Sequence, residues 1–191
     1  MRTRLLAAVE RLVGEGESFT GLSVERLVAE AGIARSTFYV YFEDKGDLLR
    51  AWFAEITREL RDSAAAWWAI DAAPSLDRVR EVLAGIVATY RPHTTLMAAV
   101  YDAAAYDPAV RDLVTSMMDE NVAGLRRHIR VGQRGGFVDP SLPAAQTAAW
   151  LTWMAERGLH QLVRTASDAE VERLVDAYAQ IVWRTLYCTS G

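Results

Sequence analysis

A short stretch in the first quarter of the chain, residues 31–49, constrains the fold more than any other part of the sequence. Gly32 stands where one helix must end and the chain must reverse, because glycine adopts the left-handed backbone conformation at little cost. After the turn, Ala34, Phe38 and Phe42 recur every fourth residue, which predicts a short helix with one apolar face. The spacing therefore predicts a helix-turn-helix.

The second helix of this pair, residues 35–42, carries polar and aromatic side chains around its apolar face. Two tyrosines and a threonine are costly to bury without hydrogen-bond partners, so an ordinary helical hairpin inside a bundle is the weaker interpretation. A short helix with a hydroxyl-rich outer face is what reading the major groove of DNA requires. We therefore predict a DNA-binding surface that consists of Arg35, Ser36, Thr37, Tyr39, Val40, Tyr41 and Lys45.

The position of a residue around this helix predicts its role. On a helix that enters the groove, the outermost residues reach base edges and the flanking residues meet phosphates. We expect Arg35, Ser36 and Val40 to bear on sequence preference. Thr37 and Tyr39 are expected to contact the DNA backbone.

The charge balance argues against a high DNA affinity. The formal net charge is −4, and residues 1–50 carry seven basic and eight acidic side chains. Composition alone does not indicate nucleic-acid binding, whereas the placement of Arg35 and Lys45 on either side of the second helix does. Lys45 is the only lysine of the chain, and we expect it to contact a phosphate. The predicted affinity is modest and sensitive to salt.

Apolar residues at helical spacing continue through the chain, and we find no alternating strand pattern. They predict an all-α fold with an N-terminal three-helix helix-turn-helix domain, residues 1–45. A C-terminal helical ligand-binding and dimerisation domain is expected over residues 46–191. One helix is expected from residue 108 to about residue 131, followed by a loop over residues 132–143. Helix starts are predicted from capping residues or first-turn prolines at Ser23, Asp44, Pro92, Pro108 and Ser167, the last in a capping box with Glu170.

Other residue types exclude several classes of protein. Cys188 is the only cysteine, so no internal disulfide forms, and Arg2 and Glu10 interrupt any apolar run near the start. We expect a cytoplasmic protein that does not act at a membrane. The three histidines share no metal-ligand spacing, and no nucleophile is paired with a base. We therefore predict neither an enzyme nor a protein with a metal or cofactor.

The last two expected helices are unusually apolar. Residues 140–155 carry no charge but are too few for a membrane span, which needs about 20 residues. Such a helix is buried on more than one side, and with the apolar stripe over residues 171–186 it fits a dimer interface. Trp150, Trp153 and Met154 lie at spacings of three and four residues, which fits either core packing or a ligand cavity.

The motif over residues 31–49 resembles the signature of TetR-type transcriptional repressors. It reads Ala-Gly-Ile, three residues, Thr-Phe-Tyr, one residue, Tyr-Phe, two residues, Lys, two residues, Leu-Leu. One departure is Ala34, where the family usually has a Ser or Thr that caps the helix, a loss of about 1 kcal/mol. Family members often carry a basic arm before the first helix, whereas here the helical pattern begins almost at Met1.

The C-terminal half resembles the repressors of ethionamide activation, a branch of the same family. The similar segments are residues 153–157 and Leu186 with Tyr187. In that branch the effector pocket is a long apolar tunnel, with an amide just before a Glu-Arg pair, and here Ala155 takes the place of the amide. The resemblance places Ile86, Tyr90, Val114, Met118, Asn121 and Thr152 around the cavity. Glu156 lies four residues after Thr152, beside the aromatic stripe of the same expected helix. The predicted effector site combines these residues with Trp150, Trp153 and Met154.

Together these features predict a ligand-responsive transcriptional repressor. It is expected to bind a double-stranded DNA operator as a homodimer formed through the last two helices. A small lipophilic effector, uncharged or weakly basic, is expected to release it. The alternatives are a ligand-independent transcriptional regulator and a helical binding module without an effector cavity.

Overall fold

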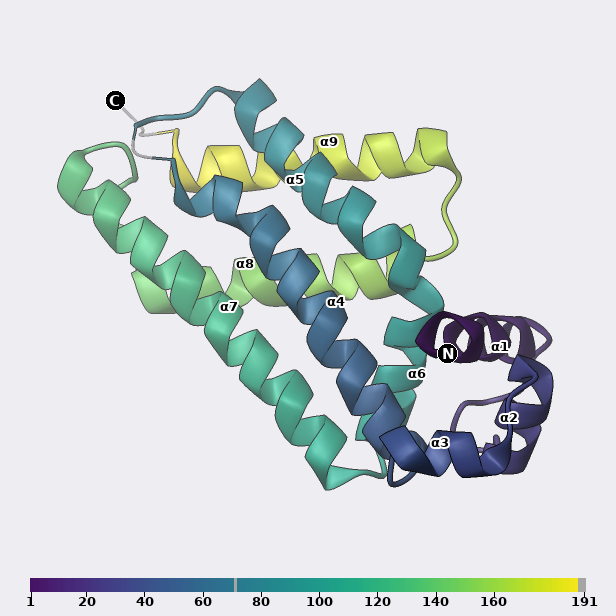
Figure 1. Cartoon of the computed structure of the whole chain (residues 1–191). Coiled ribbons are helices and arrows are strands. Elements are labelled where there is room, and N and C mark those ends of the chain that lie inside the picture. The colour runs from purple at the N-terminus through teal and green to yellow at the C-terminus, as the bar shows by residue number, and fades with distance from the viewer. Residues whose placement is uncertain (71, 189–191) are drawn as a thin grey trace. The chain divides into compact units, whose positions relative to one another are not determined.

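The computed structural model describes residues 1–70 and 72–188, and within them all regular structure is helical (Figure 1). The all-α prediction is therefore confirmed. The N-terminal helices are α1 (Arg2–Gly14), α2 (Val24–Ala31), α3 (Arg35–Tyr41) and α4 (Lys45–Trp68). They are followed by α5 (Leu76–Tyr90), the 3-10 turn η1 (Arg91–His93), α6 (Thr94–Ala104), α7 (Pro108–Gly135), α8 (Ala144–Gly158), the π-helix η2 (Leu159–Val163) and α9 (Asp168–Leu186).

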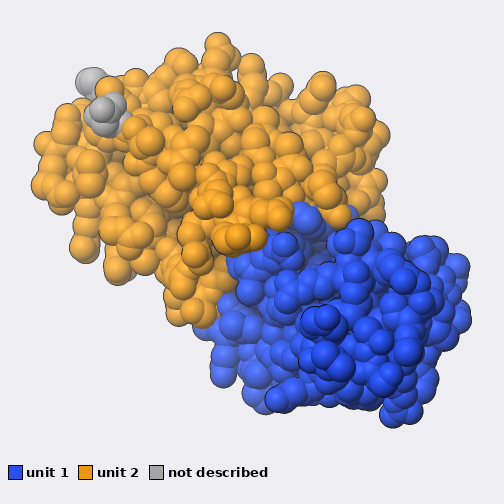
Figure 2. Space-filling model, in the orientation of Figure 1, with its two compact units in different colours: residues 1–57, 93–115 blue, residues 58–92, 116–191 orange. Residues whose placement is uncertain are grey.

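The chain divides into two compact units, coloured separately in Figure 2. Unit 1 consists of Met1–Thr57 and His93–Thr115, and unit 2 of Arg58–Pro92 and Ser116–Gly191. This division differs from the predicted boundary at residue 45. The first half of α4 belongs to unit 1, and so does α6, which packs against α1. Helices α4 and α7 each continue from one unit into the other.

Several helices begin at a capping side chain, among them the predicted caps Ser23 and Asp44. The side chains of Ser23 and Ser75 accept hydrogen bonds from the third amide of their helices, at 3.1 and 3.2 Å. At the start of α4, Asp44 Oδ1 accepts from the Asp47 amide at 2.6 Å, and Asp47 Oδ2 accepts from the Glu43 amide at 3.2 Å. These reciprocal bonds satisfy amides that a helix leaves unpaired at its N-terminus.

Three local predictions were wrong. Pro92 lies in η1 and not at the first position of α6, and α7 runs on to Gly135 before Gly136 adopts a positive φ of 76°. Ser167 is the N-cap of α9, but its side chain makes no cap hydrogen bond. The Glu170 amide donates to the Ser167 carbonyl at 3.0 Å, so the amide that the hydroxyl was expected to cap is already paired.

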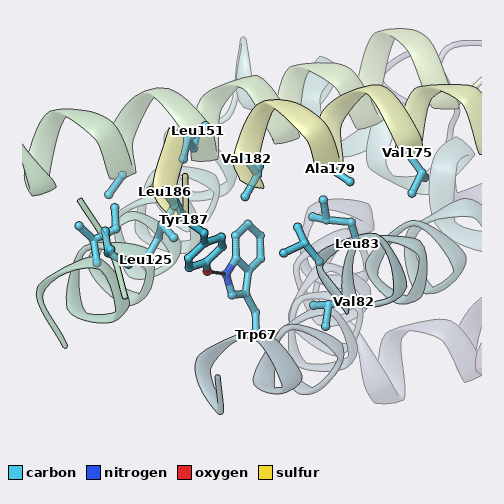
Figure 3. Packing of buried hydrophobic residues seen from close by; sticks show 14 of the residues in the cluster. Trp67, Val82, Leu83, Leu125, Leu151, Val175, Ala179, Val182, Leu186 and Tyr187 are labelled. Atoms are coloured by element: carbon cyan, nitrogen blue, oxygen red, sulfur yellow. Dashed lines mark hydrogen bonds between the residues drawn. The ribbon is translucent and has the colours of Figure 1, made fainter. Parts of the chain in front are cut away.

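The core of unit 2 is an apolar cluster from α5, α7, α8, α9 and the end of α4 (Figure 3). Inside it, Trp67 Nε1 donates to the hydroxyl of Tyr187 at 3.1 Å. That hydroxyl also lies 2.8 Å from His128 Nε2. Burial lowers the pKa of His128 to about 4, so the ring is neutral at pH 7 and Nε2 can accept from Tyr187. The three side chains form one buried hydrogen-bonded chain.

Candidate DNA-reading helix and effector-binding face

The turn before α3 has the predicted geometry. Gly32 adopts φ 61° and ψ 42°, the left-handed conformation. The Ile33 amide then donates to the Val28 carbonyl at 3.0 Å, which closes the end of α2. Ala34 has an extended backbone and offers no side-chain cap to α3, as expected for an alanine at this position. The turn thus leads directly into α3, whose N-terminus has no capping side-chain oxygen.

Helix α3 is anchored by a single residue. Phe38 is fully buried, and its ring lies 5.5 Å from that of Phe42 just after the helix. Ala34 is exposed, so the predicted apolar stripe consists of the two phenylalanines alone. All six other residues of α3 are exposed, including Val40 at 74 %. The predicted DNA-reading residues of α3 are therefore all open to a partner.

Arg35 has contacts within its own unit. Its guanidinium forms an ion pair with Glu25 on α2 and lies over the ring of Tyr39, 5.6 Å from the ring centroid. Both side chains of the ion pair are more than half exposed, so the pair contributes little to stability. Arg35 can therefore exchange this carboxylate for a DNA base or phosphate at low cost.

Lys45 lies in a different environment from the predicted one. Its Nζ donates to the carbonyl oxygens of Phe19 (3.2 Å), Leu22 (2.8 Å) and Thr20. An ammonium group has three N–H donors, and these carbonyls use all of them. Burial lowers the pKa of Lys45. This geometry favours a role in holding the loop between α1 and α2 over the predicted phosphate contact.

Positive charge near α3 is largely balanced by carboxylates. Arg11 and Arg26 pair with Glu30, and Arg50 lies within 4 Å of three aspartates. Arg2 is exposed and lies over the Phe42 ring, 6.0 Å from its centroid. These carboxylates reduce the positive charge available to DNA phosphates, and the modest affinity stays a prediction.

On α8 the predicted aromatic wall faces outward. Trp150 is 72 % exposed and Trp153 is 49 % exposed, and Met154 is exposed as well. The buried residues of the helix are Ala148, Leu151 and Glu156, so Trp150, Trp153 and Met154 do not line an internal cavity of the chain. Residue spacing identified one face of the helix correctly, but both faces are apolar and the spacing could not say which one is buried.

A groove of about 480 Å³ opens between α5, α8, η2 and α9, and its lining is almost entirely apolar. Of the predicted effector residues, only Ile86 and Met154 line it. Tyr178 also lines the groove, and its hydroxyl donates to the Leu151 carbonyl at 2.5 Å. The lining residues that sequence reasoning missed are mainly Leu159, Leu162, Val163, Leu174, Tyr178 and Ile181.

The missed residues of η2 have a structural explanation. A π-helix closes hydrogen bonds between residues five apart, so its side chains do not follow the spacing of an α-helix. Residues 159–163 carry three aliphatic side chains that do not extend the α8 stripe. The sequence showed that these residues are apolar, but their spacing did not show that they share a surface with α8.

The other predicted effector residues do not line this groove. Tyr90, Met118 and Glu156 are buried, and Val114, Asn121 and Thr152 are partly buried. Among the described residues, neither oxygen of the Glu156 carboxylate has a hydrogen-bond partner, and the same holds for the Tyr90 hydroxyl. The predicted set therefore separates into residues of the outer face and residues of the interior.

The described residues contain no group of three or more His, Cys, Asp or Glu side chains that could hold a metal ion. Among the same residues, no helix is long and apolar enough to cross a membrane. A glycine-ended turn before an exposed seven-residue helix, joined to a helical unit with an apolar groove, is typical of helix-turn-helix DNA-binding proteins.

Comparison with known proteins supports this class. Residues 5–52 match the family of bacterial regulatory proteins named tetR, and residues 79–188 match the family named transcriptional regulator EthR, C-terminal domain. The chain belongs to the TetR family of bacterial transcriptional regulators, with a C-terminal domain of the EthR type. Members of these families are regulators and not enzymes.

Individual relatives agree with the assignment. The HTH-type transcriptional regulator EthR of Mycolicibacterium smegmatis is 27 % identical over 182 residues, which cover 94 % of this chain and 82 % of that protein. The crystal structure of PfmR from Thermus thermophilus has a TM-score of 0.73 at 16 % identity, covering 97 % of this chain and 99 % of that one. A putative transcriptional regulator from Saccharomonospora viridis, in complex with choline, has a TM-score of 0.72 at 18 % identity, with 98 % of each chain covered. These two structures show the shared fold.

Proposed function

We propose that this regulator is a homodimeric repressor that leaves its operator when a small, mostly apolar effector binds its C-terminal domain. The observation that carries the DNA-reading part is the exposure of six of the seven α3 residues around the buried Phe38. Exposed hydroxyl, aromatic and aliphatic groups on a short helix match the donor, acceptor and methyl pattern of the major groove. We expect the protein to act in the cytoplasm, where operator DNA lies.

The dimer part is supported by an outer apolar face on α8, η2 and α9. We define this face as Trp150, Trp153, Met154, Leu162 and Ile181. Each of them is an exposed large hydrophobic residue of unit 2. Exposed apolar surface that adjoins a groove marks an interaction site, and a two-fold axis lets one face pair with itself. A stable dimer would bury more than roughly 1,000 Å² in total.

Trp153→Glu tests the dimer, with Val131→Glu on α7 as the matched control, because Val131 is similarly exposed but lies outside the outer apolar face. Sedimentation velocity is expected to give a dimer mass for the wild type and for Val131→Glu. It should give a monomer mass for Trp153→Glu. A monomeric wild type at micromolar concentration would contradict the proposal.

Effector release is supported by the continuity of α4, which runs for 24 residues and belongs to both units. A change at its unit 2 end can therefore be carried along one helix to the end that directly follows the DNA-reading helix in the chain. Two half-sites one DNA turn apart require recognition helices about 34–36 Å apart. To switch occupancy from nearly full to nearly empty, the effector must favour the released state by roughly 5 kcal/mol.

Selection from a random DNA library tests DNA reading and supplies the operator for further work. Ser36→Ala and Val40→Ala are expected to return a changed consensus with unchanged thermal stability. Thr37→Ala is expected to weaken binding to all sequences about equally, because a phosphate contact carries no sequence information. The same consensus from the wild type, Ser36→Ala and Val40→Ala would contradict the assignment of base-reading residues.

Operator release separates the repressor from its alternatives. The selected operator is labelled, and fluorescence anisotropy is followed while lipophilic amides, esters and amines are added. Release by at least one of them at micromolar concentration supports a ligand-responsive repressor. Retention of the operator in all cases would favour a ligand-independent regulator, and failure to select any DNA would favour a helical binding module.

A further inference from the structure

A carboxylate in the interior of unit 2 has no hydrogen-bond partner. Glu156, on α8, is 9 % exposed, and neither of its side-chain oxygens is hydrogen-bonded. Arg157 Nε lies 3.7 Å from Oε2, but the arginine side chain is itself mostly exposed. Burying an ionised carboxylate is costly unless it is paired and hydrogen-bonded. The carboxylate therefore needs hydrogen-bond donors that the described part of the chain does not provide.

Tyr90, the last residue of α5, supplies a second unpaired polar group. Its side chain is buried, and its hydroxyl has no hydrogen-bond partner in the described part of the chain. Burial raises the pKa of Tyr90, the negative charge of Glu156 raises it further, and Arg164 opposes this. The hydroxyl is therefore protonated at neutral pH and lies within electrostatic range of the carboxylate.

The two groups together favour one kind of ligand. A carboxylate offers two acceptor oxygens, and a tyrosine hydroxyl both donates and accepts. An ammonium group has several N–H donors and a positive charge, and hydrogen bonds between charged groups are the strongest of this kind. A carboxylate or phosphate ligand would instead meet the like charge of Glu156.

The position of Glu156 separates this site from the proposed dimer interface. The groove beside the outer apolar face is lined by Met154, Ala155 and Arg157 but not by Glu156. The Glu156 side chain therefore leaves α8 on the side away from the groove. A second protomer on the outer apolar face would leave the pair of Glu156 and Tyr90 unpaired.

We propose that Glu156 and Tyr90 bind the protonated nitrogen of a small amphiphilic amine, in which an apolar body carries a primary or secondary ammonium group. The inference rests on the proposed function, in which the C-terminal domain takes a small effector, and it narrows that effector to an organic cation. A bridging water could satisfy the same two groups, but it would produce no preference among ligands of different charge.

Three probes of the same shape test the site, namely phenylbutylamine, phenylbutanol and phenylbutyrate. Each is titrated calorimetrically into the full chain at neutral pH. The amine is expected to bind at least roughly tenfold more tightly than the alcohol, which corresponds to one hydrogen-bonded charge pair, and phenylbutyrate is expected to bind weakest.

Glu156→Gln should remove the preference for the amine and leave the affinity for the alcohol unchanged. Tyr90→Phe should weaken amine binding a few-fold, and Glu172→Gln, an exposed control on α9, should change nothing.

Equal affinity for amine and alcohol, no binding of the amine, or an unchanged preference in Glu156→Gln would overturn the inference. A uniform loss of all three affinities in Glu156→Gln would do the same, because it indicates a structural role for the residue. Operator release is measured separately in the anisotropy assay. If the amine binds through Glu156 and the operator stays bound, the effector function fails and the inference stands. If another ligand releases the operator and the amine preference is absent, the effector function stands and the inference fails.

Discussion

Helix α3 in unit 1 and helix α8 in unit 2 expose aromatic side chains for different reasons. Helix α3 has seven residues and one buried anchor, Phe38, so nearly every other residue must face outward. Helix α8 has fifteen residues and two apolar faces, of which the face with Ala148 and Leu151 is buried. The face with Trp150 and Trp153 is left exposed.

The difference determines where polar atoms matter energetically. On α3 the polar groups are at the surface, where desolvation is small and a substitution changes recognition without changing the free energy of unfolding. On α8 the one charged group of interest, Glu156, is in the interior, where low polarity strengthens every electrostatic effect. Changes of charge should therefore be tolerated in the first region and severe in the second.

Ala148→Glu is expected to produce the largest effect of that kind. Ala148 is fully buried in the core of unit 2, so a glutamate there would be an unpaired buried charge and would cost about 3–5 kcal/mol of unfolding free energy. Gln146→Glu, two residues away and exposed, should change it by less than about 0.5 kcal/mol. Urea unfolding of both variants measures the difference. Similar midpoints for the two would contradict the buried position of Ala148.

Acid is expected to destabilise the protein through His128. The folded-state pKa is about 4 and the ordinary value is 6.5, so the unfolded chain takes up the proton first. Stability should be complete above pH 6.5 and decrease towards pH 4, by about 3 kcal/mol from this residue. His128→Gln, whose amide oxygen can still accept from Tyr187, should lose this part of the pH dependence. Parallel pH profiles for the wild type and His128→Gln would exclude the buried neutral histidine.

Lys45→Met tests whether the lysine belongs to the loop or to the DNA contact. The three carbonyl hydrogen bonds predict a loss of about 1–2 kcal/mol in stability. DNA affinity should fall with it, but the slope of log affinity against log salt should stay unchanged. A phosphate contact would instead reduce that slope by about one unit at constant stability. Circular-dichroism melts and a binding series in salt distinguish the two.

Ala34→Thr should give the smallest effect, a gain of about 0.5–1 kcal/mol from the missing cap of α3. Ala34→Val has the same shape without the oxygen and serves as the control. Thermal melts should place the threonine variant above the valine variant. Equal stability of the two would mean that the first amides of α3 are already satisfied.

The sequence predicted unit 1 in most of its details because the rules there are local. Gly32 at its turn, Ser23 at its cap and Phe38 at its anchor each follow from a residue and its near neighbours. For Lys45 the sequence indicated a phosphate contact and not a bond to the loop, because its partners, the carbonyls of residues 19–22, are more than twenty positions away. Main-chain carbonyls have no residue-type signal in the sequence.

For the groove of unit 2, the sequence identified two lining residues, Ile86 on α5 and Met154 on α8, and missed those on η2 and α9. Trp153 and Met154 share a face, yet nothing in their spacing indicates whether that face is internal. Tyr90 was included through the family resemblance, whereas Glu156 was included because it lies four residues after Thr152 on the same helix. A π-helix at residues 159–163 shifted the side chains that line the groove, and no α-helical pattern could anticipate them.

The hydrogen bonds of Lys45 also make it a chemical reporter. Twenty of the twenty-one basic residues are arginine, so an amine-reactive reagent has one lysine side chain to modify. While Nζ donates to three carbonyls it is held as an ammonium group, which is not nucleophilic, so labelling is expected to speed up when the loop over residues 19–22 opens. The rate of labelling, followed by mass spectrometry with and without operator DNA, would therefore report how often that loop opens in solution.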